Sequence, residues 1–145
     1  MSPKILAISI SKIKHIKKSN VGCAYLKENY GIIGDAHSSS DTRRQISLLA
    51  MESINKMRDL GLNVHPGDFA ENLTTKGINL IVLSKGTKLN IGKEVTLEIT
   101  QIGKKCHNHC AIYQQAGDCV MPKEGIFAIV IKSGDVKTGD KIEII

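Results

Sequence analysis

The sequence predicts a mainly β protein: a compact β-barrel with one longer helix and a short helix that carries a cluster of cysteines. Two observations lead to this fold class. From Ile78 onward, apolar and polar residues alternate in short runs separated by glycines. Before that point, only one segment repeats its apolar residues with helical spacing. Many short strands with a single long helix favour a barrel over an alternating α/β sheet.

The length and composition favour one globular domain spanning residues 1–145. A chain of 145 residues, of which 41% are hydrophobic and 23% charged, is typical of a single folded core and excludes a disordered protein. Its apolar runs are too short to cross a bilayer, so no membrane association is expected. The segment Met1–Lys12 lacks the features of a signal peptide. We therefore expect a cytoplasmic protein whose four cysteines are thiols, ligands or redox groups.

The expected elements follow in chain order. The N-terminal segment alternates as a strand, and the polar run after Gly31 is a loop. Ser47–Leu60 is the expected helix: Ser47 can cap its start, Gly61 can end it, and Leu48, Met51, Ile54 and Met57 form an apolar stripe typical of a core. The expected later strands are Ile81–Leu83, Thr87–Leu89, Val95–Thr100, Ile126–Ile131 and Lys141–Ile145.

The net charge of +6 suits an anionic ligand. The main basic run is expected to be a solvated face; it consists of Lys12, Lys14, Lys17 and Lys18. We do not expect nucleic acid as a partner, because aromatic residues make up only 3% of the chain and leave few platforms for stacking bases.

The densest chemistry is the run Gly103-Lys-Lys-Cys-His-Asn-His-Cys110, with Cys119 nearby. Cys106 and Cys110 are four residues apart, so they would share one face of a short helix over Cys106–Gln115. Neighbouring positive charge stabilises a thiolate and lowers the pKa of a cysteine; here Lys104, Lys105, His107 and His109 can supply it.

Three interpretations of this cluster stay open. The cysteines can be small buried apolar residues, as free cysteines commonly are. They can bind zinc together with the histidines, although structural zinc sites normally use two ligand pairs well separated in sequence. They can also provide a reactive thiol beside an anionic pocket, which the basic neighbours favour.

Two further polar runs carry candidate residues. Gly34-Asp35-Ala36-His37 is followed by Arg43 and Arg44, whose guanidinium groups match phosphate or carboxylate geometry. Alone, this run is typical of a surface loop. We expect Asp68, Glu71 and Asn72 in the run Pro66–Thr75 to cap backbone groups at a strand entry. Asp140 is expected to organise the turn before the last strand.

Together these runs resemble the MOSC domain, named for the C-terminal part of molybdenum-cofactor sulfurase, in its short stand-alone form. The resemblance begins near Val21 and depends on several blocks that occur in order. These are Gly34–His37, Arg44-Gln45, Pro66–Thr75, Gly86–Gly92, Thr100–Cys110, Gly117–Phe127 and Gly134–Ile142.

The resemblance implies a compact β-barrel and a cysteine that carries sulfur or contacts the molybdenum of a pterin cofactor. By position, that role falls to Cys106, as catalytic thiol or metal ligand, with Cys110 as the competitor; Lys105 stands where the family often has proline. The expected cofactor-binding residues are Asp35, His37, Arg44, Lys105 and His107. Pyridoxal phosphate is also associated with such domains, but no lysine here has a recognisable site for it.

The leading hypothesis is a sulfur-carrier or cofactor-binding domain of molybdenum-cofactor metabolism, with sulfur-transferase-like activity left open. Its expected partners are a cysteine desulfurase or other sulfur donor, and molybdenum-cofactor biosynthesis proteins or molybdoenzymes. The alternatives are a non-enzymatic module that binds and delivers molybdenum-pterin, and a zinc-stabilised structural protein. A redox enzyme resembling molybdenum-dependent N-hydroxy reductases ranks last, because those contain an additional N-terminal barrel.

Overall fold

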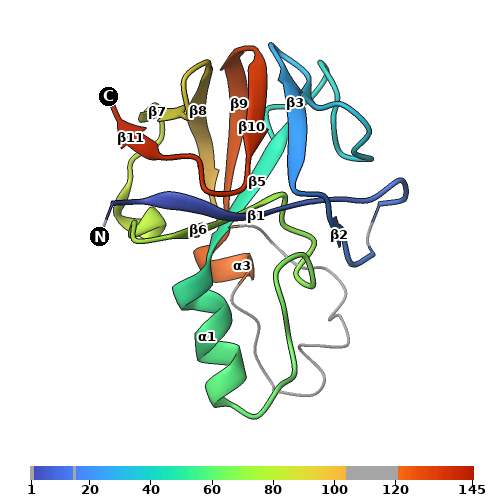
Figure 1. Cartoon of the computed structure of the whole chain (residues 1–145), viewed down its shortest axis with the longest axis vertical. Coiled ribbons are helices and arrows are strands. Elements are labelled where there is room, and N and C mark those ends of the chain that lie inside the picture. Colours follow the sequence, from blue (N-terminus) through green and yellow to red (C-terminus); the bar gives the residue numbers. More distant parts are fainter. Residues whose placement is uncertain (1, 15, 104–120) are drawn as a thin grey trace.

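The structure is a computed structural model that describes residues 2–14, 16–103 and 121–145 (Figure 1). Strands dominate it. In chain order, the elements are β1 Lys4–Ile10, β2 Ser19–Asn20, β3 Cys23–Lys27, β4 Gly31–Ile32, β5 Ile46–Ala50, α1 Met51–Asp59, β6 Leu73–Lys76, the 3-10 turn η1 Leu80–Val82, β7 Lys88–Ile91, β8 Val95–Ile102, α3 Met121–Glu124, β9 Ile126–Lys132, β10 Gly134–Lys137 and β11 Ile142–Ile144.

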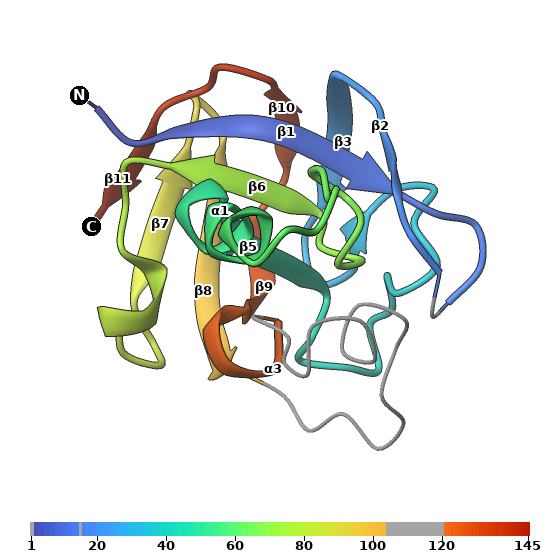
Figure 2. The ribbon, with the colours of Figure 1, turned by 90° about the horizontal axis from the view of Figure 1, so that it is seen from below.

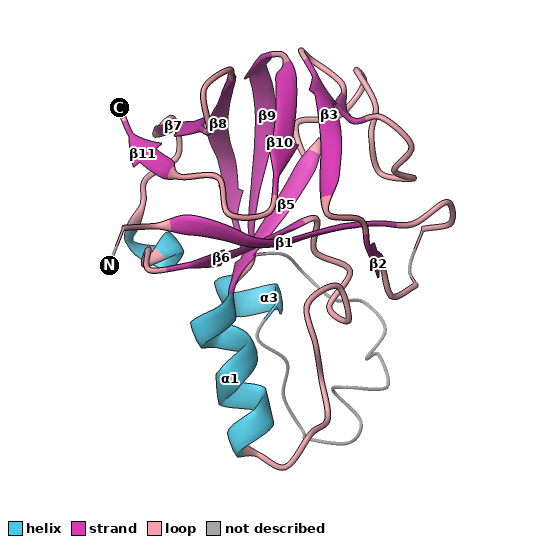
Figure 3. Ribbon diagram, in the orientation of Figure 1, coloured by secondary structure: helices cyan, strands magenta, loops and turns pink. Residues whose placement is uncertain are grey.

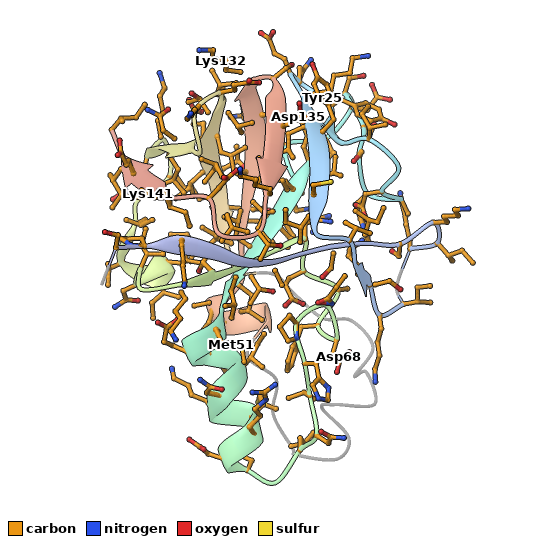
Figure 4. The ribbon with its side chains drawn as sticks, viewed as in Figure 1. Tyr25, Met51, Asp68, Lys132, Asp135 and Lys141 are labelled. Atoms are coloured by element: carbon orange, nitrogen blue, oxygen red, sulfur yellow. The ribbon has the colours of Figure 1, made fainter. Side chains whose placement is uncertain are left out.

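Eight strands form one sheet in the order β11-β7-β8-β9-β5-β6-β1-β2, and β10, β3 and β4 form a smaller one. The large sheet curls until β1 meets the residues just before β11. There Lys4 bridges Lys141, which is labelled in Figure 4, and the Ile5 N–H donates to the carbonyl of Asp140 at 2.8 Å. The expected mainly β, barrel-like fold with one longer helix is therefore confirmed. The expected short helix over Cys106–Gln115 lies outside the described residues.

Two apolar clusters fill the fold. The larger occupies the concave side of the curled sheet and includes Ile8, Leu26, Leu48, Leu97 and Ile126, all with exposed fractions of 1% or less. The smaller joins α1 to the other side of the sheet through Leu49, Ile54, Met57, Val64, Phe69 and Phe127. Figures 2 and 3 show α1 projecting from the sheet beneath β5 and β6. No helix in the described residues is long and apolar enough to span a membrane.

One expected element is wrong in part and another is wrong altogether. Ser47–Ala50 was expected as the first turn of the helix, but it belongs to the central strand β5, between β6 and β9. All five β5 residues are buried, so Leu48 and Leu49 face different clusters instead of one helical stripe. Helix α1 begins at Met51, with no side-chain hydrogen bond at its N-cap residue.

The second correction concerns Ile81–Leu83, where a strand was expected. Leu80–Val82 forms a 3-10 turn instead, in which Leu80 is buried while Ile81 and Val82 are exposed. The remaining predicted strands after Gly86 all overlap observed strands. The helix ends at Asp59, and Gly61 follows its C-cap residue Leu60 as the expected terminator, with a φ of 95° that favours glycine.

Candidate functional site

The loop of residues 33–45, between β4 and β5, carries three of the expected cofactor-binding residues. Just before the loop, the backbone of Gly31 passes very close to other parts of the loop. A Cβ built on Gly31 would lie 2.5 Å from the carbonyl oxygen of Gln45 and 2.8 Å from Ser38 Oγ, so only glycine fits there. Figure 2 shows this loop beside the hairpin that joins β1 to β2, at one end of the large sheet.

Asp35 is buried at the start of the loop and is paired with Lys18 from the hairpin. Lys18 Nζ lies 2.7 Å from Asp35 Oδ1, and the side chains of both residues have an exposed fraction of 0%. The Ser11 N–H also donates to Oδ1, at 3.1 Å, and the His37 N–H donates to Oδ2, at 3.2 Å. The ion pair therefore fastens the loop to the hairpin.

Burial alone would raise the pKa of Asp35. The hydrogen bonds from Lys18 and from the backbone of Ser11 and His37, together with the positive charge of Lys18, outweigh that effect and bring the pKa below its usual value. Asp35 is therefore a carboxylate at neutral pH, and its charge is balanced inside the protein rather than by water.

His37 follows two residues later and contacts the same lysine. Lys18 Nζ lies 3.1 Å from His37 Nδ1, and the imidazole retains 34% exposure. The structure therefore brings Asp35 and His37 together, as the sequence suggested. It adds Lys18 and Ser11, which the sequence did not single out.

Lys18 corrects the interpretation of the basic run as a solvated face. Lys12, Lys14 and Lys17 are exposed as expected, but Lys18 has a total exposed fraction of 4%. The burial results from the pairing with Asp35, 17 residues away, which no local pattern reveals. The four lysines have similar neighbours in the sequence, so the sequence does not indicate which of them is buried.

Arg44 lies outside this network, at the other end of the loop. It is exposed, and its guanidinium carbon lies 5.6 Å from the centroid of the Phe127 ring. Its backbone N–H donates to Thr42 Oγ1. Among the described residues, the guanidinium has no ion-pair or hydrogen-bond partner, so it can accept an anionic ligand.

Arg44 also lies beside the stem of segment 104–120, by which we mean the end of β8 and the start of β9 that flank this segment. Segment 104–120 contains the cysteine cluster. Phe127 of β9 pairs with Gln101 of β8. Just past the end of β8, the Gly103 N–H donates to the Gly125 carbonyl at 2.6 Å. The neighbouring Arg43 carbonyl accepts a hydrogen bond from Thr100 Oγ1, which fixes the loop to β8.

The remaining expected site residues fall within segment 104–120. Cys106, Cys110, Lys105 and His107 lie outside the described residues, as do His109 and Cys119. Within the described ranges, no group of three or more His, Cys, Asp or Glu side chains could hold a metal ion. The fourth cysteine, Cys23, is exposed on β3.

The run after Pro66 stabilises backbone, as expected. Asp68, on the loop between α1 and β6, accepts a hydrogen bond from the His65 N–H at 2.8 Å (Figure 4). Asn72 accepts one from the Ser47 N–H and donates to the Ser9 carbonyl.

Glu71 is fully buried, and burial raises its pKa despite hydrogen bonds from neutral donors. Asp140 also behaves as expected, since its carboxylate accepts the Lys137 N–H.

Residues 33–143 match the MOSC domain, which is more than half of the chain. The chain belongs to the MOSC domain family. The matched range includes the loop with Asp35, His37 and Arg44. No curated protein matches.

Solved structures support the MOSC fold. The YuaD protein from Bacillus subtilis superposes with a TM-score of 0.82 at 21% identity, covering 99% of this chain and 96% of that one. YiiM from Geobacillus stearothermophilus gives a TM-score of 0.71 at 18% identity, covering 99% and 75%. YiiM from Escherichia coli gives 0.68 at 20% identity, covering 100% and 70%.

The MOSC family is associated with the molybdenum cofactor, and the described donors can be compared with what that group needs. A pterin phosphate requires cationic or N–H donors. The Arg44 guanidinium can satisfy this need. The Lys18 nitrogen cannot, because its three protons already have acceptors in Asp35, Ser11 and His37. Arg44 therefore fits the anionic part of the cofactor.

Proposed function

We propose that this MOSC protein binds the molybdenum cofactor and carries sulfur for it on Cys106 or Cys110. The observation that carries the proposal is the position of Arg44, an exposed guanidinium at the stem of the cysteine segment. Family membership supplies the association with the cofactor. When bound, the cofactor supplies the molybdenum centre that the carried sulfur serves.

In this proposal Arg44 holds the phosphate of the pterin. The face of Phe127 supports the guanidinium through a cation–π contact and leaves its N–H groups free for two phosphate oxygens. The Thr100–Arg43 hydrogen bond limits the movement of the loop relative to β8. Loop and strand together therefore hold the backbone next to Arg44 in place while its guanidinium packs on Phe127.

The sulfur step uses the thiolate of Cys106 or Cys110. This thiolate attacks the outer sulfur of a donor persulfide, such as that of a cysteine desulfurase. A new S–S bond forms on this protein, the S–S bond of the donor breaks, and the donor leaves as a thiolate. Lys105 and His107 favour the ionised attacking thiol by their positive charge. Molybdenum-cofactor biosynthesis proteins or molybdoenzymes are the proposed recipients.

Mass spectrometry of the intact protein tests this step after incubation with a cysteine desulfurase and cysteine. All variants carry Cys23→Ser, because the exposed Cys23 thiol can react with the sulfur donor outside the proposed site. We expect a gain of one sulfur atom that is lost in Cys106→Ser or in Cys110→Ser. If the parent gains no sulfur, or if both variants gain as much as the parent, the carrier function is wrong.

A second candidate function is a module that binds and delivers molybdenum-pterin without transferring sulfur. The observation in its favour is that Arg44 can hold a phosphate without any help from the cysteines. This module would bind the pterin stoichiometrically and lose the pterin in Arg44→Ala, while no variant would gain sulfur. Arg58→Ala is not a suitable control, because the Arg58 Nε donates to the Val64 carbonyl at 2.8 Å. Arg43→Ala removes an equal charge from a side chain that is 70% exposed and that makes one surface ion pair, with Glu98 at 3.7 Å, which contributes little to stability.

Metal analysis of the purified protein separates both candidates from a zinc-stabilised structural protein. Stoichiometric zinc that is lost in Cys106→Ser, Cys110→Ser and Cys119→Ser would assign these residues to a structural site. We expect less than stoichiometric zinc, since a reactive thiol must be available to the sulfur donor.

A further inference from the structure

The positive charge of the chain is concentrated in its N-terminal segment. Residues 1–27 contain six lysines and no aspartate or glutamate. Six of the 20 basic residues therefore lie there and 14 follow, and these are balanced by the 14 acidic residues, all of which come after residue 27. The net charge of +6 thus comes from the N-terminal segment alone.

Three of these six lysines are exposed on the hairpin that joins β1 to β2. They are Lys12, Lys14 and Lys17, and none of them takes part in an ion pair formed among the described residues. The fourth lysine of the hairpin, Lys18, is neutralised by Asp35. Figures 1 and 2 show the hairpin extending past the end of the large sheet. Uncompensated positive charge therefore gathers on one protruding hairpin.

Two large apolar side chains are exposed among these lysines. Ile13 has an exposed fraction of 64% and Ile16 one of 47%. Single exposed isoleucines are common on protein surfaces, but these two occur on one short hairpin and alternate with cationic residues. The hairpin therefore presents apolar surface and positive charge together.

Ile16 also lines an open hollow of about 320 Å³. The other residues that line it are Ile10, Ser11, Lys12, Lys17 and Ser19. The hollow begins at the Ile10–Ser19 pair, where the β1–β2 ladder ends. Its wall combines aliphatic side chains with two lysines, so an apolar group that enters it has cationic groups beside it.

The hairpin is held in place by the loop of residues 33–45. The Ala36 N–H donates to the Ser11 carbonyl at 2.8 Å, and the Ser11 N–H donates to Asp35 Oδ1 at 3.1 Å. Ser11 Oγ donates to the Ile13 carbonyl at 2.9 Å, which closes a turn within the hairpin itself. A surface that is ordered before binding loses less conformational entropy when a partner docks.

We propose that this hairpin is a docking surface for an acidic segment of a partner protein. One aliphatic side chain of that segment enters the hollow beside Ile16, and the carboxylates next to it face Lys12, Lys14 and Lys17. An apolar contact with complementary charges around it is the usual composition of a protein–protein interface. The surface includes neither Arg44 nor a cysteine, so the inference does not depend on the proposed function.

A protein segment suits this surface better than an anionic membrane does. Segments that bind anionic lipids typically contain clusters of about four to eight lysines or arginines, and here three are exposed. The hollow also favours a protein, because a partner can fill it with one side chain whereas a flat lipid surface has none to insert. Charge and shape together therefore point to an acidic protein segment.

Titration of the uniformly 15N-labelled full chain with a synthetic peptide tests the surface. The probe is acetyl-Gly-Glu-Asp-Leu-Glu-Asp-Gly-amide, which places one leucine between carboxylates. We expect saturable shifts of the assigned backbone amide signals, centred on Ile10, Ile16 and Lys17. The affinity should fall as the ionic strength rises from about 0.01 M to about 0.15 M, because the screening length falls from about 30 Å to about 8 Å.

A matched pair of triple variants tests the contribution of charge. The test variant combines Lys12→Gln, Lys14→Gln and Lys17→Gln. The control combines Lys85→Gln, Lys88→Gln and Lys93→Gln, which are exposed lysines elsewhere in the chain. We expect the test variant to bind the peptide roughly tenfold more weakly and to lose most of the salt dependence. The control should change the affinity by less than about twofold, since distant exposed charges are screened.

A second matched pair tests the apolar contact. Ile16→Ser should weaken binding roughly fivefold, because the isoleucine can no longer bury apolar surface against the peptide leucine. Ile144→Ser replaces an isoleucine that is 56% exposed on β11 and should bind like the wild type. Replacing the peptide leucine by glycine should have the effect of Ile16→Ser, and the two changes together should cost little more than either alone.

The docking surface is wrong if the peptide causes no saturable shifts at the hairpin, or if the two triple variants bind it equally. It is also wrong if a peptide with glutamine and asparagine in place of the acids binds as tightly. Vesicles of phosphatidylcholine and phosphatidylserine test the other occupant: binding to vesicles but not to the peptide, lost in the test variant, would overturn the protein partner. No sulfur donor is present in these titrations, so the docking surface and the sulfur-carrier function can fail separately.

Discussion

Two buried carboxylates, Asp35 and Glu71, have similar numbers of hydrogen bonds but different electrostatic surroundings. Asp35 accepts from Lys18 Nζ and from two backbone N–H groups. Glu71 accepts from the Gly67 and Phe69 N–H groups and from Thr74 Oγ1. Only Asp35 has a cationic partner. As a result, the pKa of Asp35 lies below its usual value and that of Glu71 lies above it.

The two carboxylates also differ in what they connect. All donors to Glu71 lie within four residues of it, so Glu71 organises one local turn before β6. Ser11 and Lys18 lie 24 and 17 residues before Asp35, so Asp35 joins a hairpin to the candidate site loop. Charge compensation is therefore found where two distant segments must stay together, and neutral donors suffice for a local turn.

The largest expected effect comes from Lys18→Met. It leaves the Asp35 carboxylate buried without a counter-ion, and such unpaired buried charges cost about 3–5 kcal/mol. We expect the free energy of unfolding, measured by urea denaturation, to fall by that amount. The matched control Lys17→Met should change it by less than about 0.5 kcal/mol, because Lys17 is exposed. Equal values for the two variants would show that the ion pair does not stabilise the fold.

Glu71→Gln is expected to have the next largest effect. Both carboxylate oxygens face donors: Phe69 N–H on one side, Gly67 N–H and Thr74 Oγ1 on the other. A glutamine has only one acceptor oxygen, so its NH₂ group must face a donor, which costs about 1–3 kcal/mol. The exposed Glu143 gives the control Glu143→Gln, for which we expect almost no change. Equal unfolding energies would mean that the Glu71 side chain rearranges.

The pH dependence of stability separates the two carboxylates by sign. The folded state lowers the pKa of Asp35, so its contribution is complete above the usual aspartate pKa of about 4 and is lost as the pH falls through the lower folded value. The folded state raises the pKa of Glu71, so its contribution is lost as the pH rises through the higher folded value.

Urea denaturation from acid to neutral pH measures both contributions. Asp35→Asn should flatten the acid side of the stability profile, while Glu71→Gln should flatten the decline above the usual glutamate pKa of about 4.3. If both variants flatten the same side, the opposite pKa directions assigned to the two residues are wrong.

The sequence predicted the fold better than the site for a physical reason. Alternation in Val95–Ile102 reports which face of one strand is buried, and that is a local property. The central strand β5 is buried on both faces, so its run Ile46–Ala50 has no alternation and was joined to the following helix. Gly61 was correctly expected to end that helix, because its backbone conformation is set by the adjacent turn.

The site depended on contacts between distant residues. Asp35 and His37 stood out because two titratable residues occur together in a polar run. Lys18 did not, because its burial depends on Asp35 rather than on its own neighbours. Arg44 could be proposed as an anion ligand from its chemistry, but its position over Phe127 of β9 required the sheet register.

The smallest expected effect comes from Lys56, which forms a second lysine–carboxylate pair of similar geometry. Lys56 Nζ lies 2.9 and 3.0 Å from the two oxygens of Glu124, but the lysine side chain is 60% exposed. Water already solvates the lysine charge there, although the Glu124 side chain is only 17% exposed, so pairing should stabilise the fold by about 0–1 kcal/mol and weaken with added salt. A double-mutant cycle of Lys56→Met and Glu124→Gln isolates this coupling from the separate Ser53–Glu124 hydrogen bond. If the coupling energy were as large as the loss of unfolding free energy in Lys18→Met, proximity rather than burial would explain the stabilisation by the Lys18–Asp35 pair.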